Sequence, residues 1–210
     1  MAFPTVSGPY GLRPLNLVGG TPFAGATRHM PIASGYATAI YNGDVVQYKN
    51  DGTLIITTLQ NNVAPVAGVV GVFLGCTYTD PNLGYTLYSQ SYPGNVAATD
   101  IRAYVCDDPN ALFKVVNCAT AAANGAAGGL LPAFKARTNS ISKNAELVLN
   151  TGVTASGNSR MGVFINNVAT ALPMTVVDMV EGTDNAAGES VEFIVKFTAG
   201  YHRYTHTVGV

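Results

Sequence analysis

The feature that most limits the fold of this chain is its division into short, β-branched apolar runs separated by turn-forming residues. Asn-Gly at 42–43 and Asp-Gly at 51–52 are typical of tight turns, and β-rich runs follow them at 44–49 and 53–58. No long segment repeats its apolar residues every 3 to 4 positions, as an amphipathic helix would. The sequence therefore predicts an all-β fold, either a β-barrel or β-tulip-like domain or a sandwich, with long loops.

The later runs support this prediction in two ways. Residues 66–78 carry Gly68, Gly71 and Gly75, and glycines inside a strand indicate bends or close approach of another backbone. The run 190–198 alternates strictly, so that its odd-numbered residues from Val191 to Phe197 share one face, as in a half-buried strand. Further strands are predicted at 101–108, 111–118, 146–150, 160–166 and 174–181.

Two connections have unusual compositions. Residues 79–99 are polar and rich in tyrosine, which is typical of a functional or interface loop, although packing of the loop on the domain is the alternative. Residues 119–129 are rich in Ala and Gly and predict a short helix or a loop, with a subdivision of the domain as a further alternative. The tyrosines near the first connection are Tyr78, Tyr85, Tyr88 and Tyr92.

The first thirty-five residues differ from the rest of the chain. They contain five prolines, no acidic residue, and only Arg13 and Arg28 as full charges. Because proline lacks an N–H and fixes φ, this segment cannot form a continuous helix or a central strand. Its many apolar residues are not typical of a disordered tail. We therefore predict an extended N-terminal arm at 1–35, lying on its own domain or on another chain, and a mainly β domain at 36–210.

The charge content narrows the classes of function. Charged residues make up 11% of the chain and the formal net charge is −1, which favours association into an oligomer or a larger assembly. The sequence has no basic cluster of the kind that binds nucleic acid, and no apolar run long enough for a transmembrane helix. It also lacks a signal-peptide pattern, so we expect synthesis in a cytoplasm and no membrane partner.

The motifs of catalysis and metal binding are missing from the sequence. No nucleophile elbow, phosphate-binding loop or dense acidic cluster occurs, so we expect neither an enzyme nor a cofactor. His202 and His206 are spaced so that a metal is not excluded, but exposed or interface histidines are favoured. Asp107 and Asp108 stand before Pro-Asn and predict a turn rather than an acid–base pair.

The three cysteines form no C-x-x-C pair. They are widely spaced and odd in number, which favours free, half-buried thiols over a disulfide. The disulfide remains the alternative. The cysteines are Cys76, Cys106 and Cys118.

Several stretches together resemble the head decoration, or capsid cement, proteins of tailed bacteriophages, in particular those of marine phages and cyanophages. They are PYGLRPLNLVGG, RHMPIASGYATAIYNGDVVQYKNDGTL, VVGVFLGCTYTD, DDPNALFKV and FIVKFTAGYHRY, which lie across most of the chain but not in its Ala/Gly-rich middle. The resemblance implies a non-enzymatic virion protein on the outer capsid surface. Such proteins commonly form trimers, so the implied partners are the major capsid protein and two further copies of this chain.

The resemblance also implies that the arm is the capsid-binding element. Its backbone would add to an exposed strand edge of the capsid, and its apolar side chains would fill pockets. Multivalent binding of this kind would resist the pressure of the packed DNA. The implied contacts are Phe3, Tyr10, Leu12, Arg13, Leu15, Leu17, Phe23 and Arg28.

Three alternatives belong to other classes. A tail-tube or fibre subunit would also be β-rich, with long arms or loops, but would form rings or stacks. A secreted glycan-binding module is disfavoured by the missing signal pattern and by the absence of Trp. An enzyme is disfavoured by the missing motifs.

Overall fold

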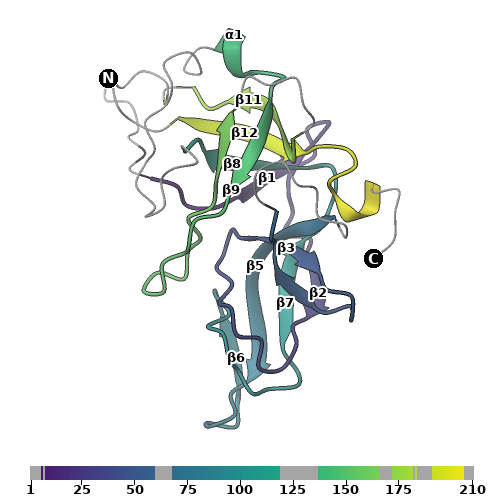
Figure 1. The fold of residues 1–210 in the computed structure, drawn as a ribbon, viewed down its shortest axis with the longest axis vertical. Helices are drawn as coiled ribbons and strands as arrows, with labels where there is room; N and C mark the ends of the chain where they lie inside the picture. Colours follow the sequence, from purple (N-terminus) through teal and green to yellow (C-terminus); the bar gives the residue numbers. More distant parts are fainter. Residues whose placement is uncertain are drawn as a thin grey trace.

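The computed structural model describes residue 6 and residues 8–59, 68–118, 137–165, 172–181, 183 and 191–205. It confirms the all-β prediction, with two antiparallel six-stranded sheets and one short α-helix, α1 (Arg137–Ser140). The sheets are open and sandwich-like. Figure 1 shows the first sheet, called sheet A, in the upper half of the view and the second, sheet B, in the lower half.

Sheet A is built from six strands. In spatial order they are β1 (Arg13–Leu17), β8 (Ala111–Val116), β12 (Glu192–Phe197), β11 (Met174–Met179), β9 (Asn144–Val148) and β10 (Gly162–Ile165). An isolated parallel bridge between Asn117 and Val163 brings the end of β8 close to β10.

Sheet B is centred on the long strand β5 (Val69–Thr79), and β6 (Thr86–Ser89) pairs with the far end of β5. The order of the other strands around β5 is β2 (Arg28–Pro31), β7 (Arg102–Cys106), β5, β3 (Val45–Tyr48) and β4 (Leu54–Ile56). The turn between β7 and β8 carries the chain from sheet B to sheet A.

The N-terminal segment is built into the domain. Its strands β1 and β2 are edge strands, one in each sheet, and pair with β8 and β7. Both strands contain a proline, Pro14 and Pro31, which is compatible only with an edge because proline offers no ladder N–H. The predicted arm therefore lies on its own domain over its described part, and Phe3 lies outside the described residues.

The strands expected after residue 43 are confirmed, but β6, α1 and the 3₁₀ helix η2 (Arg203–Thr205) were missed. Strand β6 lies inside the connection 79–99 and forms a short hairpin with β5. It was not predicted because the many turn residues of this connection indicate a loop. Helix α1 has only four residues, too few for a periodic signal. The predicted helix or loop at 119–129, and with it the alternative subdivision of the domain, lies outside the described residues.

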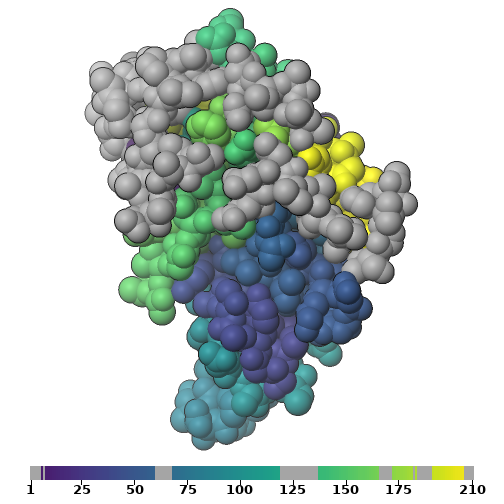
Figure 2. Space-filling view, in the orientation of Figure 1, coloured from purple at the N-terminus to yellow at the C-terminus, as the bar shows by residue number. Residues whose placement is uncertain are grey.

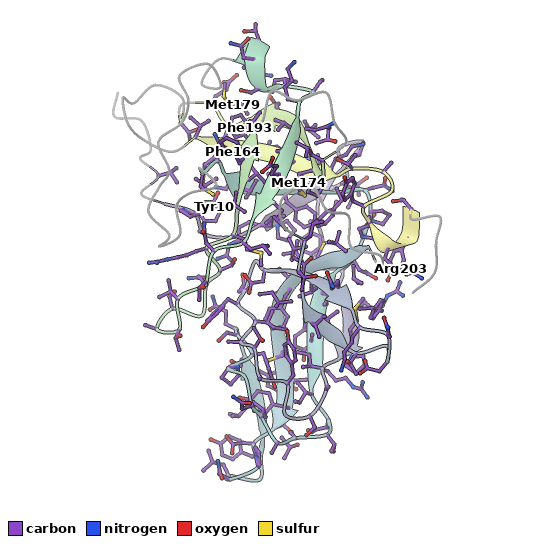
Figure 3. All side chains as sticks on the ribbon, in the orientation of Figure 1. Tyr10, Phe164, Met174, Met179, Phe193 and Arg203 are labelled. Carbon is purple, nitrogen blue, oxygen red and sulfur yellow. The ribbon has the colours of Figure 1, made fainter. Side chains whose placement is uncertain are left out.

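The apolar core consists of two clusters that meet at β5. Val69 and Val72 belong to the cluster centred on sheet A, whereas Val70 and Phe73 belong to the cluster inside sheet B. Strand β12 buries the odd-numbered face of the predicted alternation, from Val191 to Phe197. Figure 3 labels Met174, Met179 and Phe193 of the sheet A cluster.

The glycines of β5 mark close approaches, as predicted. At Gly71 an added Cβ would lie 2.1 Å from the carbonyl oxygen of Cys106. Gly75 has a φ of +153° and lies next to an irregularity in the register with β7. Side chains at these positions would push β5 away from its neighbours.

We predict that Gly71→Ala lowers the free energy of unfolding by about 3 kcal/mol, because the methyl group would overlap a backbone oxygen that has no room to move. Chemical denaturation monitored by circular dichroism would measure the change. Thr86→Ala, an exposed residue on the neighbouring β6, is the control and should change stability by less than about 0.5 kcal/mol. Equal stabilities of the two variants would contradict the packing argument.

Candidate functional site

The candidate site is the N-terminal segment from Gly8 to Pro31 and the surface around it. At its centre Leu12 is fully buried in the sheet A core. The N–H of Leu12 donates to the carbonyl of Gly43 at 2.9 Å, and the N–H of Gly11 donates to the carbonyl of Met161 at 3.1 Å. Gly11 has a φ of +82°, and a Cβ at this position would lie 2.6 Å from Cβ of Ser159. The segment is therefore held by both backbone bonds and close packing.

Arg13 connects the N-terminal segment to two loops through hydrogen bonds. Its guanidinium donates one N–H to Oδ1 of Asn42 and another to Oδ1 of Asn158, the latter at 2.7 Å. The side-chain amide of Gln90 donates to the same Asn158 oxygen at 2.7 Å. Burial lowers the pKa of Arg13, although a guanidinium remains charged at any physiological pH. The planar fork of arginine suits two separated acceptors of this kind.

Tyr10 attaches the N-terminal segment to sheet A at a second point. Its hydroxyl donates to Oε1 of Glu192 at 2.5 Å, and Nζ of Lys114 lies 3.2 Å from the same oxygen. The Lys114 ammonium also lies 5.5 Å from the centroid of the Tyr10 ring. Burial and the bond to Glu192 raise the pKa of Tyr10, so the phenol stays a neutral donor. Tyr10 is labelled in Figure 3 on the side of sheet A.

A pocket of about 460 Å³ lies between this segment and the loop that joins β9 to β10. Arg160 and Glu192 give it charges of both signs. Its described lining contains serines but neither histidine nor cysteine, so it offers no nucleophile paired with a base. The lining residues are Val6, Gly8, Pro9, Tyr10, Val153, Ser156, Asn158, Ser159, Arg160 and Glu192.

The outer surface of the segment is uncharged from residue 14 to residue 27. Within this stretch Leu15 is 40% exposed and Val18 is 51% exposed. Leu17 and Phe23 are half-buried and pack against the sheet A core. We call residues 14–27 the uncharged surface.

The backbone of the uncharged surface is already hydrogen-bonded within the chain. The N–H of Leu17 donates to the carbonyl of Thr21 at 2.8 Å, and the N–H of Phe23 donates to the carbonyl of Leu15 at 3.2 Å. The segment after β1 thus folds back along the outer edge of that strand. Addition of β1 to a partner's strand edge, which the sequence suggested, would first require these bonds to break.

Arg28 begins β2 and faces the β7–β8 turn. Its Nε lies 2.9 Å from Oδ2 of Asp107, which also accepts the Tyr204 hydroxyl at 2.6 Å. The Arg28 guanidinium lies 5.4 Å from the centroid of the Tyr204 ring. Burial and the bond to Asp107 raise the pKa of Tyr204. Arg28 is thus held by the chain's own turn and tail.

The predicted contact residues therefore divide into two groups. Leu12 is fully buried in the chain's own core, so its side chain is not open to a partner in this conformation. Tyr10, Arg13 and Arg28 have partners inside the chain, although Arg28 stays 61% exposed. Among the described apolar residues of this set, Leu15 is the exposed one, and its exposed neighbour Val18 was missed although it stands directly before Gly-Gly.

The tail differs from the expectation for its histidines. His202 was expected at the surface, but it is 1% exposed, because the tail returns to β5 and the N–H of Val69 donates to the carbonyl of Tyr201 at 2.8 Å. Burial lowers the pKa of His202. His206 lies outside the described residues. The predicted turn at 107–110 is confirmed, with the N–H of Asn110 donating to Oδ1 of Asp108 at 2.7 Å.

The tyrosines near the connection 79–99 have two different roles. Tyr78 and Tyr92 are buried in the sheet B core. Tyr85 is 53% exposed and Tyr88 is 77% exposed, and Leu83 in the same hairpin is 61% exposed. Figure 2 shows this hairpin projecting at the lower end of the molecule. Local packing thus applies to Tyr78 and Tyr92, whereas Tyr85 and Tyr88 are exposed and stay candidates for a contact surface.

The three cysteines are free and fully buried, more deeply than expected. Burial raises the pKa of the thiols to about 12 for Cys76 and Cys118 and about 11 for Cys106. Among the described residues no group of three or more His, Cys, Asp or Glu side chains could hold a metal ion. In the same part of the chain no helix is long and apolar enough to cross a membrane.

Comparison with known proteins adds no further assignment. No family model matches the chain, and neither a curated protein nor a solved structure is similar to it.

We predict that Arg13→Lys lowers the free energy of unfolding by about 1–2 kcal/mol, because a lysine ammonium cannot reach both asparagine oxygens in the geometry of the guanidinium. Denaturant unfolding would measure the loss. Arg28→Lys is the matched control, since its single ion pair is exposed, and should cost less than about 0.5 kcal/mol. A larger loss for Arg28→Lys than for Arg13→Lys would contradict this ranking.

We also predict that a thiol-specific aromatic disulfide reagent labels none of the three cysteines of the native protein within minutes, because buried thiols with raised pKa values form little thiolate. All three should react at once in denaturant. Absorbance of the released thiolate is the readout, and rapid labelling of native protein would contradict the burial.

Proposed function

We propose that this chain is a non-enzymatic virion structural protein that binds the outer surface of a phage capsid and cements neighbouring major capsid subunits. The observation that carries the proposal is the uncharged surface, 14–27, which holds the exposed Leu15 and Val18 without a single charged side chain. Both exposed residues lie within PYGLRPLNLVGG, one of the stretches that resemble capsid cement proteins.

The chemistry of this surface suits a protein partner. Removing an uncharged surface from water costs little, because no ion has to lose its hydration. Interface centres are depleted in charge, while their rims are polar. Arg28, which remains partly exposed at the end of the surface, can add a rim contact with a capsid carboxylate.

In this proposal the N-terminal segment acts as a fixed face rather than a free arm. Leu12, Tyr10 and Arg13 hold the segment on the domain, so that Leu15 and Val18 are presented without the entropy loss of ordering a loose chain. We expect a homotrimer on the capsid, in which three such faces act together and raise the overall affinity.

A tail-tube or fibre subunit is the second candidate. The observation that favours it is the projecting hairpin with Leu83, Tyr85 and Tyr88, a second exposed apolar surface in the other sheet. Two separate surfaces of this kind suit a subunit that stacks on copies of itself.

We predict that Val18→Asp weakens binding to expanded capsids of the parent phage about tenfold or more, because an unpaired carboxylate would be buried in the contact. Cosedimentation with purified capsids would measure the affinity. Tyr88→Asp, at a residue that is also exposed but lies in the projecting hairpin, is the control and should bind as the unchanged protein does.

The outcomes separate the candidates. No saturable binding by the folded, unchanged protein would overturn the capsid proposal. Rings or stacks that form in its place and are lost in Tyr88→Asp would favour the tail-tube candidate.

A further inference from the structure

The loop 41–44 is the place where the N-terminal segment and both sheets are joined. Gly43 accepts the N–H of Leu12 at 2.9 Å and donates its own N–H to the carbonyl of Phe73 in β5 at 2.8 Å. Asn42 accepts the N–H of Ser159, before β10, at 2.9 Å. A change in the stability of this loop therefore acts directly on the attachment of the N-terminal segment.

Asp44 ends this loop with a carboxylate that is 1% exposed. Its Oδ2 accepts the backbone N–H of Tyr41 at 2.8 Å. Its Oδ1 has no hydrogen-bond partner among the described residues; the nearby Ser159 hydroxyl favours the ionised form without completing a bond to this oxygen. An ionised carboxylate in such a place is costly, because it is buried and its Oδ1 has no hydrogen-bond partner among the described residues.

Among the described residues around Asp44, no cation compensates for this charge. On the N-terminal segment, Arg13 directs its guanidinium to Asn42 and Asn158. On the loop itself the Tyr41 hydroxyl is bonded to Thr154 at 3.0 Å. After the β9–β10 loop, Arg160 lines the pocket beside Tyr10 and makes contacts of its own. Burial, which favours the protonated form of Asp44, therefore outweighs the Ser159 hydroxyl and the Tyr41 N–H, which favour the ionised form.

We propose that protonation of Asp44 controls how firmly the N-terminal segment is held on the domain. With the proton bound, the loop 41–44 carries no buried charge and holds Gly11 and Leu12 in place. With the proton lost, the loop is destabilised and these attachments open more often. The inference concerns contacts within the chain and goes beyond the proposed capsid binding.

The sign of the pH dependence follows from the burial. Burial raises the pKa of Asp44 from its ordinary value near 4 to about 6, so the folded state binds the proton more tightly than the opened state. The contribution of Asp44 to stability is therefore greatest at low pH and is lost as the pH rises through about 4 to 6.

Other titratable groups change the stability with pH in the opposite direction or over another pH range. The lowered pKa of buried His202 removes stability as the pH falls below about 6.5. The lowered pKa values of Asp51 and Asp100 act only at more acidic pH. The contribution of Asp44 is therefore measured by comparing the pH dependence of the unchanged protein with that of an Asp44 variant. The pH dependence of the unchanged protein alone contains the contributions of all these groups.

Amide hydrogen exchange of the full chain tests the proposal at pH 5 and pH 7.5, after correction for the intrinsic pH dependence of exchange. The protection of the Leu12 amide, which is bonded to Gly43, should fall about tenfold between these pH values in the unchanged protein. In Asp44→Asn, whose side chain has no proton to lose in this range, the protection of the Leu12 amide should be the same at pH 5 and pH 7.5. The amide of Val195 in β12 is the internal control and should change equally in both proteins.

A second variant keeps the test decisive if Asp44→Asn fails to fold. Ser159→Ala removes a hydroxyl that favours the ionised form, so the midpoint of the pH dependence should move to higher pH. An equal pH dependence of Leu12 protection in the unchanged protein and Asp44→Asn, or an unmoved midpoint in Ser159→Ala, would overturn the proposal. A pH-dependent loss spread equally over Leu12 and Val195 would overturn it as well.

Discussion

The close approach of two backbones, at Gly11 and Gly43, is the constraint on which the organisation of this protein depends. A Cβ on Gly43 would lie 3.1 Å from the Cα of Gly11, and both glycines have φ values in the left-handed region. This approach lets Leu12 enter the core and donate to Gly43. The N-terminal segment, sheet A and sheet B meet at this point, so a side chain here would separate all three.

The N-terminal segment consequently has an inner and an outer role. Its inner side fills the core and makes buried polar attachments through Tyr10, Leu12 and Arg13. Its outer side is uncharged and exposes Leu15 and Val18. A surface that is fixed from behind loses little entropy on binding, which supports the proposal that this segment is a docking face.

Buried ionisable groups are arranged differently in the two halves. Glu192 on sheet A has a lysine and a tyrosine as partners, so its charge is compensated. Asp44, where the sheets meet, has a backbone N–H but no cation. Burial of Asp44 favours its protonated form, and this buried carboxylate underlies the inferred pH response.

The class of fold and most of the strands could be predicted from the sequence. Periodicity and turn residues are local signals, so the alternation of β12, the turn at 107–110 and the glycines of β5 could be read directly. The prolines correctly excluded the N-terminal segment from the centre of a sheet.

Which residues pack against one another could not be predicted from the sequence and became clear from the three-dimensional fold. Whether Leu12 faces a partner or its own core, and whether His202 lies in water or against β5, depends on contacts between residues far apart in the chain. The local sequence pattern gives no information about such contacts. The exposure of Leu15 and Val18 and the unpaired oxygen of Asp44 belong to this second class, because both are set by how the segments pack together.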